Sequence, residues 1–256
     1  MIASVPMYNQ PDCLPATDRY WALIRDGLRV AGVAAPDHLT WGMPNFLDHW
    51  QRDDLVLSQT CGYPFRAILY GKVTLIGTPD FGVEGCAPGY YRSVFITRLD
   101  DSRRDLAAFQ DARFAYNDAM SQSGWAAPQN HVAGLGLGFR FRNLLHSGGH
   151  ALSAGAVLNG RADIASVDAV TWRFLARNDP ALAGLRVLDR TDPTPSLPYI
   201  AALGANRAVV FDAVAAAISA LHPQDRETLG LKGIVHIPAE AYLAVPTPAP
   251  PDQIAH

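Results

Sequence analysis

Short apolar runs alternate along this chain with longer segments whose apolar residues recur every three or four positions. The short runs are rich in Val, Ile, Leu and Phe, which is typical of buried strands. We expect strands at residues 2–7, 55–58, 73–77, 92–98, 113–117, 162–166 and 185–188. Strands that alternate with helices predict an α/β fold with parallel sheets.

The longer segments predict helices that bury one face. The first begins at Thr17 and ends at Gly32, a residue type that commonly follows a helix end. Further helices are expected at residues 139–145, 153–159 and 211–221. The tail after Pro246 is rich in proline, so we expect it to be loose.

The end of one predicted strand has the features of an anion-binding site. The strand at 113–117 leads into Ser121, Gln122, Ser123 and Gly124, and a helical turn follows. The first N–H groups of a helix lack intrahelical acceptors and lie at the positive end of its dipole. Together with two hydroxyls they can hold an anion. Serine is also a routine N-cap, so both interpretations are open for this 121–124 turn.

Polar turns lie at other strand ends as well. They are residues 8–11, 59–64, 90–93, 121–124 and 147–150, with Asp168 as the last. Open α/β sheets place their ligands at such strand ends. A single turn of this kind would be an ordinary loop, whereas the whole set indicates a ligand site.

The chain has two candidate crossings between lobes, near residues 91–97 and 191–200. The second contains Pro193, Pro195 and Pro198, which make it stiff and extended. We therefore predict an outer lobe of residues 1–93 and 198–256 and an inserted lobe of residues 94–197. Small ligands usually bind in the cleft between two such lobes.

Composition limits the partners. The 256 residues are 49% apolar and 18% charged, as in a folded globular protein. A net charge of −3 and the lack of any Lys/Arg run argue against nucleic-acid binding. No apolar stretch is long enough to insert into a membrane, and the N-terminus does not resemble a secretory leader. We expect a cytoplasmic protein as the sequence stands, or a periplasmic one if a leader is missing.

Metal, cofactor and disulfide signals are weak. Cys13, Cys61 and Cys86 are too few and too scattered for a disulfide scaffold or a zinc ribbon. We expect free thiols, but the sequence leaves open whether Cys61 and Cys86 pair. His146 and His150 are spaced like two metal ligands on a helix, yet Ser-Gly-Gly between them disfavours a helix. We expect no metal and no cofactor.

A hydrolase site is a formal alternative. Ser123, His150 and Asp168 could supply a Ser/His/Asp set. The chain has no G-x-S-x-G elbow, and a serine beside free N–H groups suits holding an anion better than attacking a carbonyl. We therefore expect a binding protein with no catalytic residues. Asp168 is either an N-cap or a hydrogen-bond partner in the cleft.

In their order along the chain, these motifs resemble the phosphonate-binding (PhnD-like) solute-binding proteins of ABC transporters. The matching motifs are residues 7–8 with Pro11, 58–64, 77–79 with 85–86, 90–93, Asn117 with 121–124, 147–150 with Ser153, 160–165 with Asp168, and 197–199. The match covers about residues 3–200, and the order of the motifs makes it specific. The resemblance implies a type II periplasmic-binding-protein fold, with two α/β lobes that close over a ligand.

The resemblance also implies a set of ligand-binding residues. They are Tyr8, Gln59, Tyr63, Tyr91, Asn117, Ser121, Gln122, Ser123, Gly124, His150 and Asp168. The 121–124 turn corresponds to the helix start that holds the phosphonate group in this family. His150 would be a further donor, and Asp168 would face the amino end of the ligand.

The implied function is capture of a small oxyanion, phosphonate-like or phosphate-like, for delivery to an ABC permease. A cytoplasmic copy could not deliver from outside, so a ligand-sensing module is an alternative. A thiamine-pyrimidine synthase is another, because these enzymes share the fold. They carry a cysteine-rich cluster, however, which the three dispersed cysteines do not match.

Overall fold

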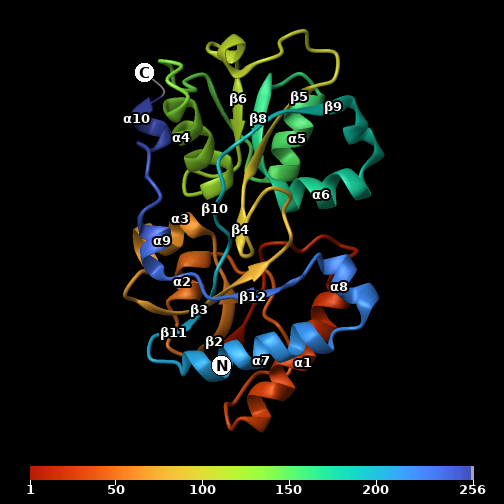
Figure 1. Cartoon of the computed structure of the whole chain (residues 1–256), viewed down its shortest axis with the longest axis vertical. Coiled ribbons are helices and arrows are strands. Elements are labelled where there is room, and N and C mark those ends of the chain that lie inside the picture. Colours follow the sequence, from red (N-terminus) through yellow and green to blue (C-terminus); the bar gives the residue numbers. More distant parts are fainter. Residues whose placement is uncertain (255–256) are drawn as a thin grey trace. The chain divides into compact units, whose positions relative to one another are not determined.

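The computed structural model describes residues 1–254, and these divide into two units (Figure 1). Unit 1 consists of Met1–Tyr90 and Pro195–Ala244, and unit 2 consists of Tyr91–Thr194 and the described residues 245–254. The crossings lie three residues before the predicted ones. Residues 255–256, the end of the predicted outer lobe, lie outside the described residues.

Unit 1 is built on a mixed five-stranded sheet in the order β1-β2-β11-β3-β12. Its strands are β1 (Ile2–Ala3), β2 (Leu55–Gln59), β3 (Val73–Asp80), β11 (Tyr199–Ala202) and β12 (Gly233–Val235). β1 and β2 are parallel, whereas β11 runs antiparallel to both β2 and β3. The sheet is therefore not purely parallel, because the chain re-enters unit 1 in the opposite direction and inserts β11 at the centre.

Helices complete unit 1. They are α1 (Leu14–Val30), α2 (Phe46–Trp50), α3 (Gly62–Pro64) with the π-helix η1 (Phe65–Leu69), α7 (Arg207–Ala220), α8 (Pro223–Leu229) and α9 (Ala239–Leu243). α1 begins before the predicted Thr17, whose hydroxyl donates to the carbonyl of Cys13. α1 packs on α7, where the small residues Gly27 and Ala213 allow close approach.

Unit 2 has a second mixed sheet, in the order β7-β6-β8-β5-β9. Its strands are β5 (Ser93–Arg98), β6 (Phe114–Tyr116), β7 (Leu144–His146), β8 (Ile164–Asp168) and β9 (Leu185–Arg190). β6 is parallel to β7 and β8, and β5 is antiparallel to β8 and β9. A separate pair of short strands, β4 (Tyr90–Tyr91) and β10 (Thr194–Pro195), lies where the chain passes between the units.

Two helical segments surround the candidate site in unit 2. The π-helix η3 (Gln122–Ala126) continues into α4 (Ala127–Gly134), and α5 (His150–Leu158) follows β7. The remaining helical segments are η2 (Leu106–Phe109), α6 (Ala169–Asn178), η4 (Pro180–Gly184) and α10 (Pro251–Ile254). No helix within residues 1–254 is long and apolar enough to cross a membrane.

The helix predicted at 139–145 is wrong. These residues form an extended segment that ends in β7. Phe141 is buried and stacks on Phe114, with ring centroids 4.3 Å apart. Gly136 and Gly138 adopt positive φ, which disfavours a continuous helix here.

The C-terminal tail was predicted to be loose and to belong to the outer lobe. In the structure the segment from Val245 groups with unit 2. The side-chain amide of Asn130 donates to the carbonyl of Pro246, and the indole N–H of Trp125 donates to that of Ala249. Pro251 and Ile254 are buried. These contacts hold a proline-rich segment that lacks long secondary structure of its own.

Candidate functional site

The 121–124 turn forms the N-terminus of the π-helix η3. Ser121 is its N-cap, and the Ser121 hydroxyl accepts the N–H of Gly124 at 3.0 Å. The Ser121 carbonyl accepts the N–H of Trp125 at 3.2 Å and that of Ala126 at 3.0 Å. The bond to a residue five positions ahead gives a wider turn than an α-helix, and such turns are frequent at functional sites. Ser121 therefore acts as a cap, as one of the two interpretations predicted.

The carbonyl of Ser123 is held by side chains outside the helix. Ala127 donates its N–H to the carbonyl of Gln122, five residues earlier. In the same π-helical register, the donor to the Ser123 carbonyl would be residue 128. That residue is Pro128, which has no N–H. The buried hydroxyls of Ser93 and Ser166 donate to this carbonyl instead, at 3.0 and 2.7 Å. The start of the helix is thereby fixed to β5 and β8.

Ser123 is paired with His150. The Ser123 hydroxyl lies 2.9 Å from Nε2 of His150 and 3.5 Å from the hydroxyl of Ser121. Burial lowers the pKa of His150 to about 4, so the ring is neutral at pH 7. Its buried Nδ1 has no hydrogen-bond partner among the described residues. Which group donates in this pair depends on the tautomer of His150. In the tautomer with the proton on Nε2, the ring donates to Ser123 and the serine proton is free for an acceptor.

Asn117 explains the glycine at position 124. A Cβ on Gly124 would lie 1.8 Å from Oδ1 of Asn117 and 3.3 Å from the ring of His150. Only glycine lets the turn approach these two side chains so closely. Asn117, Ser123, Gly124 and His150, predicted from separate motifs, therefore lie together in unit 2.

Asp168 does not complete a catalytic triad. Its Oδ1 accepts the N–H groups of Val170 and Thr171, at 2.7 and 2.9 Å, and so caps α6. Nδ1 of His150, which a triad carboxylate would orient, has no partner among the described residues. A histidine with a pKa of about 4 is also a weak general base at neutral pH. The Ser123–His150 pair therefore lacks the partner that a triad needs, and in its Nε2–H tautomer it can donate the Ser123 hydroxyl to an acceptor.

The remaining predicted residues of unit 2 are buried. Gln122 lies in the first turn of η3, and Tyr91 belongs to β4. Their roles toward a ligand stay predictions.

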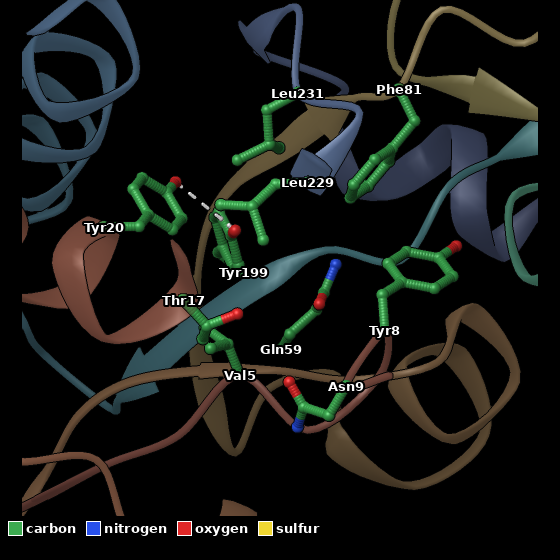
Figure 2. Close-up of a pocket in the computed structure, with 10 residues that line it drawn as sticks. All are labelled: Val5, Tyr8, Asn9, Thr17, Tyr20, Gln59, Phe81, Tyr199, Leu229 and Leu231. Atoms are coloured by element: carbon green, nitrogen blue, oxygen red, sulfur yellow. Dashed lines mark hydrogen bonds between the residues drawn. The ribbon is translucent and has the colours of Figure 1, made fainter. Parts of the chain in front are cut away.

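Unit 1 contains a small pocket (Figure 2). It is lined by Val5, Tyr8, Asn9, Thr17, Tyr20, Gln59, Phe81, Tyr199, Leu229 and Leu231. Two of these residues, Tyr8 and Gln59, belong to the predicted ligand set. The cavity volume is about 30 Å³, enough for roughly one or two water molecules. Tyr63 does not line it: Tyr63 is buried in α3, with the guanidinium of Arg66 4.6 Å from its ring centre.

The polar side chains of this pocket are uncharged types, and several of them are hydrogen-bonded within the protein. Figure 2 shows the hydroxyl of Tyr20 directed at that of Tyr199, 3.3 Å away. Burial raises the pKa of Tyr199 to about 12 and that of Tyr20 well above its usual value. The amide of Gln59 donates to the carbonyl of Leu197 at 3.3 Å. Tyr8 meets Phe81 edge to face, with ring centroids 4.7 Å apart.

Most of the pocket was not predicted from the sequence. Thr17 and Tyr20 are three residues apart on α1, a spacing that indicates a shared face. Tyr199, Leu229 and Leu231 come from the far end of the chain, and no local pattern connects them to Tyr8.

Neither a three-ligand metal site nor a disulfide is present among residues 1–254. Among residues 1–254, no group of three or more His, Cys, Asp or Glu side chains is placed to hold a metal ion. His146 ends β7 and His150 begins α5, so they do not share a helix. Within residues 1–254, Cys13, Cys61 and Cys86 form no disulfide.

Comparison with protein families identifies the chain. Residues 56–242, more than half of the sequence, match the family model described as the phosphonate periplasmic substrate-binding protein of an ABC transporter. The chain belongs to this phosphonate-binding family. No curated protein matches the sequence significantly.

Solved structures agree with this family in fold. PhnD1 from Prochlorococcus marinus, in complex with methylphosphonate, aligns with a TM-score of 0.71 at 15% identity, covering 94% of each chain. A binding-protein component of an ABC phosphonate transporter from Pseudomonas aeruginosa gives a TM-score of 0.63 at 15% identity, covering 92% of this chain and 80% of that one.

A histidine kinase sensor domain similar to periplasmic binding proteins gives a TM-score of 0.54 at 15% identity, covering 93% of this chain and 98% of that domain. The predicted type II periplasmic-binding-protein fold is confirmed. Its two sheets are mixed, whereas the sequence predicted parallel sheets.

Proposed function

We propose that this protein captures a small phosphonate-like oxyanion as the substrate-binding component of an ABC transporter. The observation that carries the proposal is the Ser123–His150 pair at the start of η3, 2.9 Å apart. In this proposal the anion rests on the 121–124 turn of unit 2.

The chemistry of the turn supports an oxyanion. The N–H groups of Ser121 and Gly124 donate within the protein, to the Asp118 carbonyl and the Ser121 hydroxyl. The backbone N–H and the hydroxyl of Ser123 are the donors proposed for the ligand, and the oxygens of a phosphonate are acceptors. With a net charge of −3, the chain as a whole does not attract anions. Local donors and the helix dipole must therefore supply the affinity.

Sensing is the second candidate. It is favoured by the likeness in fold to a histidine kinase sensor domain. Transport requires an ABC permease as partner and a periplasmic location, whereas sensing requires neither. Ligand binding on the 121–124 turn is common to both.

Thermal unfolding with a ligand panel tests the binding step. The panel contains phosphate, phosphite and methylphosphonate, with sulfate and methanesulfonate as matched sulfur oxyanions. A phosphorus oxyanion at 100 times its Kd stabilises by about 2.7 kcal/mol, which raises Tm by about 5–10 °C for a chain of this size. If only the sulfur oxyanions shift Tm, the proposed ligand class is wrong.

Ser123→Ala tests the site. Loss of a hydrogen bond to a charged group costs about 1.5–3 kcal/mol, or a roughly 10- to 150-fold increase in Kd. Ser219→Ala is the control, because Ser219 is an exposed serine of α7. Equal Kd values for the two variants would remove Ser123 from the site.

A further inference from the structure

The tail segment (residues 245–254) lies against the helical segment that carries the candidate anion site. The indole N–H of Trp125 donates to the carbonyl of Ala249 at 3.1 Å. The side-chain amide of Asn130 donates to the carbonyl of Pro246 at 2.8 Å. Trp125 lies in η3 and Asn130 in α4, which continues η3, so the tail segment is bound along one helical segment of its own unit.

Trp125 connects the tail segment to the 121–124 turn. Its side chain is fully buried, and its ring centroid lies 5.2 Å from that of Tyr116, the last residue of β6. The backbone N–H of Trp125 donates to the carbonyl of Ser121, so Trp125 belongs to the first turn of η3. Because a buried ring of this size is held in place by the groups packed around it, contacts on the indole also restrict the backbone of the turn.

The short helix α10 at the end of the tail segment is packed as well. Ile254 is buried, whereas its neighbour Gln253 is exposed. Burial raises the pKa of Tyr116, and nearby carboxylates, among them that of Asp252, raise it further. Asp252 is therefore close enough to act on Tyr116. The tail segment thus reaches both aromatic residues that flank the 121–124 turn.

The register of the turn makes these contacts important. Single π-helical turns are uncommon, because the α-helical register normally competes with them. The Ser93 and Ser166 hydroxyls hold the Ser123 carbonyl from the sheet. The tail segment adds an independent set of contacts, because it acts on the Trp125 side chain, two residues after that carbonyl.

We propose that the tail segment is a positioning element for anion binding. By holding Trp125 it keeps the 121–124 turn in its ligand-binding conformation, without contacting the ligand. The proposal rests on the proposed function, because it takes this turn as the anion site. Coupling between two sites is reciprocal, so a bound anion holds the tail segment in place by the same factor by which the tail segment improves anion affinity.

Ile254→Asp tests the effect of the tail segment on the ligand. It places a carboxylate at a buried position of α10, outside the 121–124 turn, and Gln253→Asp adds the same charge at the neighbouring exposed position as the matched control. In calorimetric titration we expect Ile254→Asp to raise the Kd of methylphosphonate by about fivefold or more. Gln253→Asp should change this Kd by less than about twofold, and the milder Ile254→Ala should raise it by less than Ile254→Asp does. If Ile254→Asp and Ile254→Ala lower Tm but leave the Kd equal to that of the control, the tail segment is structural only and the proposal is wrong.

Hydrogen exchange on the wild-type chain tests the reciprocal effect. Amides of the tail segment that exchange faster than those of β5 and β8 report local opening and not global unfolding. With saturating methylphosphonate, these amides should exchange about fivefold more slowly or less. An unchanged rate in a chain that binds methylphosphonate would overturn the positioning role and leave the proposed function intact. Failure of methylphosphonate, phosphite and phosphate to bind the wild type would instead overturn the proposed function.

Discussion

The two serines that hold the Ser123 carbonyl should control anion affinity, although neither needs to touch the ligand. Ser93 on β5 and Ser166 on β8 donate to this carbonyl at 3.0 and 2.7 Å. The perturbation is the double variant Ser93→Ala/Ser166→Ala. It removes both external donors from a carbonyl that Pro128 leaves without a partner in the π-helical register.

The magnitude follows from the hydrogen bonds lost. Each neutral bond contributes about 0.5–1.5 kcal/mol, and a buried acceptor left without any partner costs about 1–3 kcal/mol. Either single variant leaves one serine in place and should lower the free energy of unfolding by about 1 kcal/mol or less. The double variant should lose more than the sum of the singles, because only there is the carbonyl unsatisfied.

The assay pairs urea unfolding with titration of methylphosphonate. We expect the double variant to lose roughly 10-fold in affinity in addition to stability, since the helix start is no longer fixed to the sheet. Pro128→Ala restores an N–H five residues after Ser123 and should recover part of both losses when added to the double variant. Pro128→Ala alone is the reference for that comparison.

Two outcomes would refute this reasoning. If the double variant binds methylphosphonate as tightly as the wild type while losing stability, the two hydroxyls are structural only. If Pro128→Ala recovers neither quantity, the missing backbone donor is not the reason that the serines are needed.

Two further predictions concern neighbours of Ser123. Gly124→Ala should abolish measurable binding of methylphosphonate, because its Cβ would lie 1.8 Å from Oδ1 of Asn117. The control Gly155→Ala, in α5 with open space around it, should bind methylphosphonate normally. Normal binding by both variants would contradict the predicted clash. The ligand-free protein should lose stability as pH falls from 6.5 to 4, by up to about 1.4 kcal/mol per pH unit, because the unfolded state binds the His150 proton first. In urea unfolding, the free energy of unfolding of His150→Gln should not fall with pH in this way, whereas that of the exposed control His146→Gln should. Identical pH profiles for the wild type and His150→Gln would count against a buried, neutral ring.

Local patterns were sufficient to find most of the elements. The strands predicted at 55–58, 73–77 and 92–98 correspond to β2, β3 and β5 within a few residues, because their apolar side chains are buried in the sheets. The segment 139–145 failed because aromatic residues suit both a helix face and an extended core segment. Its conformation is decided by packing on Phe114, a contact that no local pattern shows.

The candidate site likewise contains features that local sequence predicts and features that depend on long-range contacts. The 121–124 turn could be found from the sequence, because a helix start depends on residues that are adjacent in the chain. The anchoring by Ser93 and Ser166 could not, since both come from strands far from the turn in sequence. Tyr63 was proposed from its motif alone, and the structure places its ring beneath Arg66 instead of in the pocket.

The central claim is that the 121–124 turn holds the oxyanion. A crystal structure with methylphosphonate tests it most directly. We predict phosphonate oxygens within about 2.6–3.2 Å of the Ser123 hydroxyl and of the first N–H groups of η3. A phosphonate bound elsewhere, with Ser123 and His150 contacting only each other, would contradict the account.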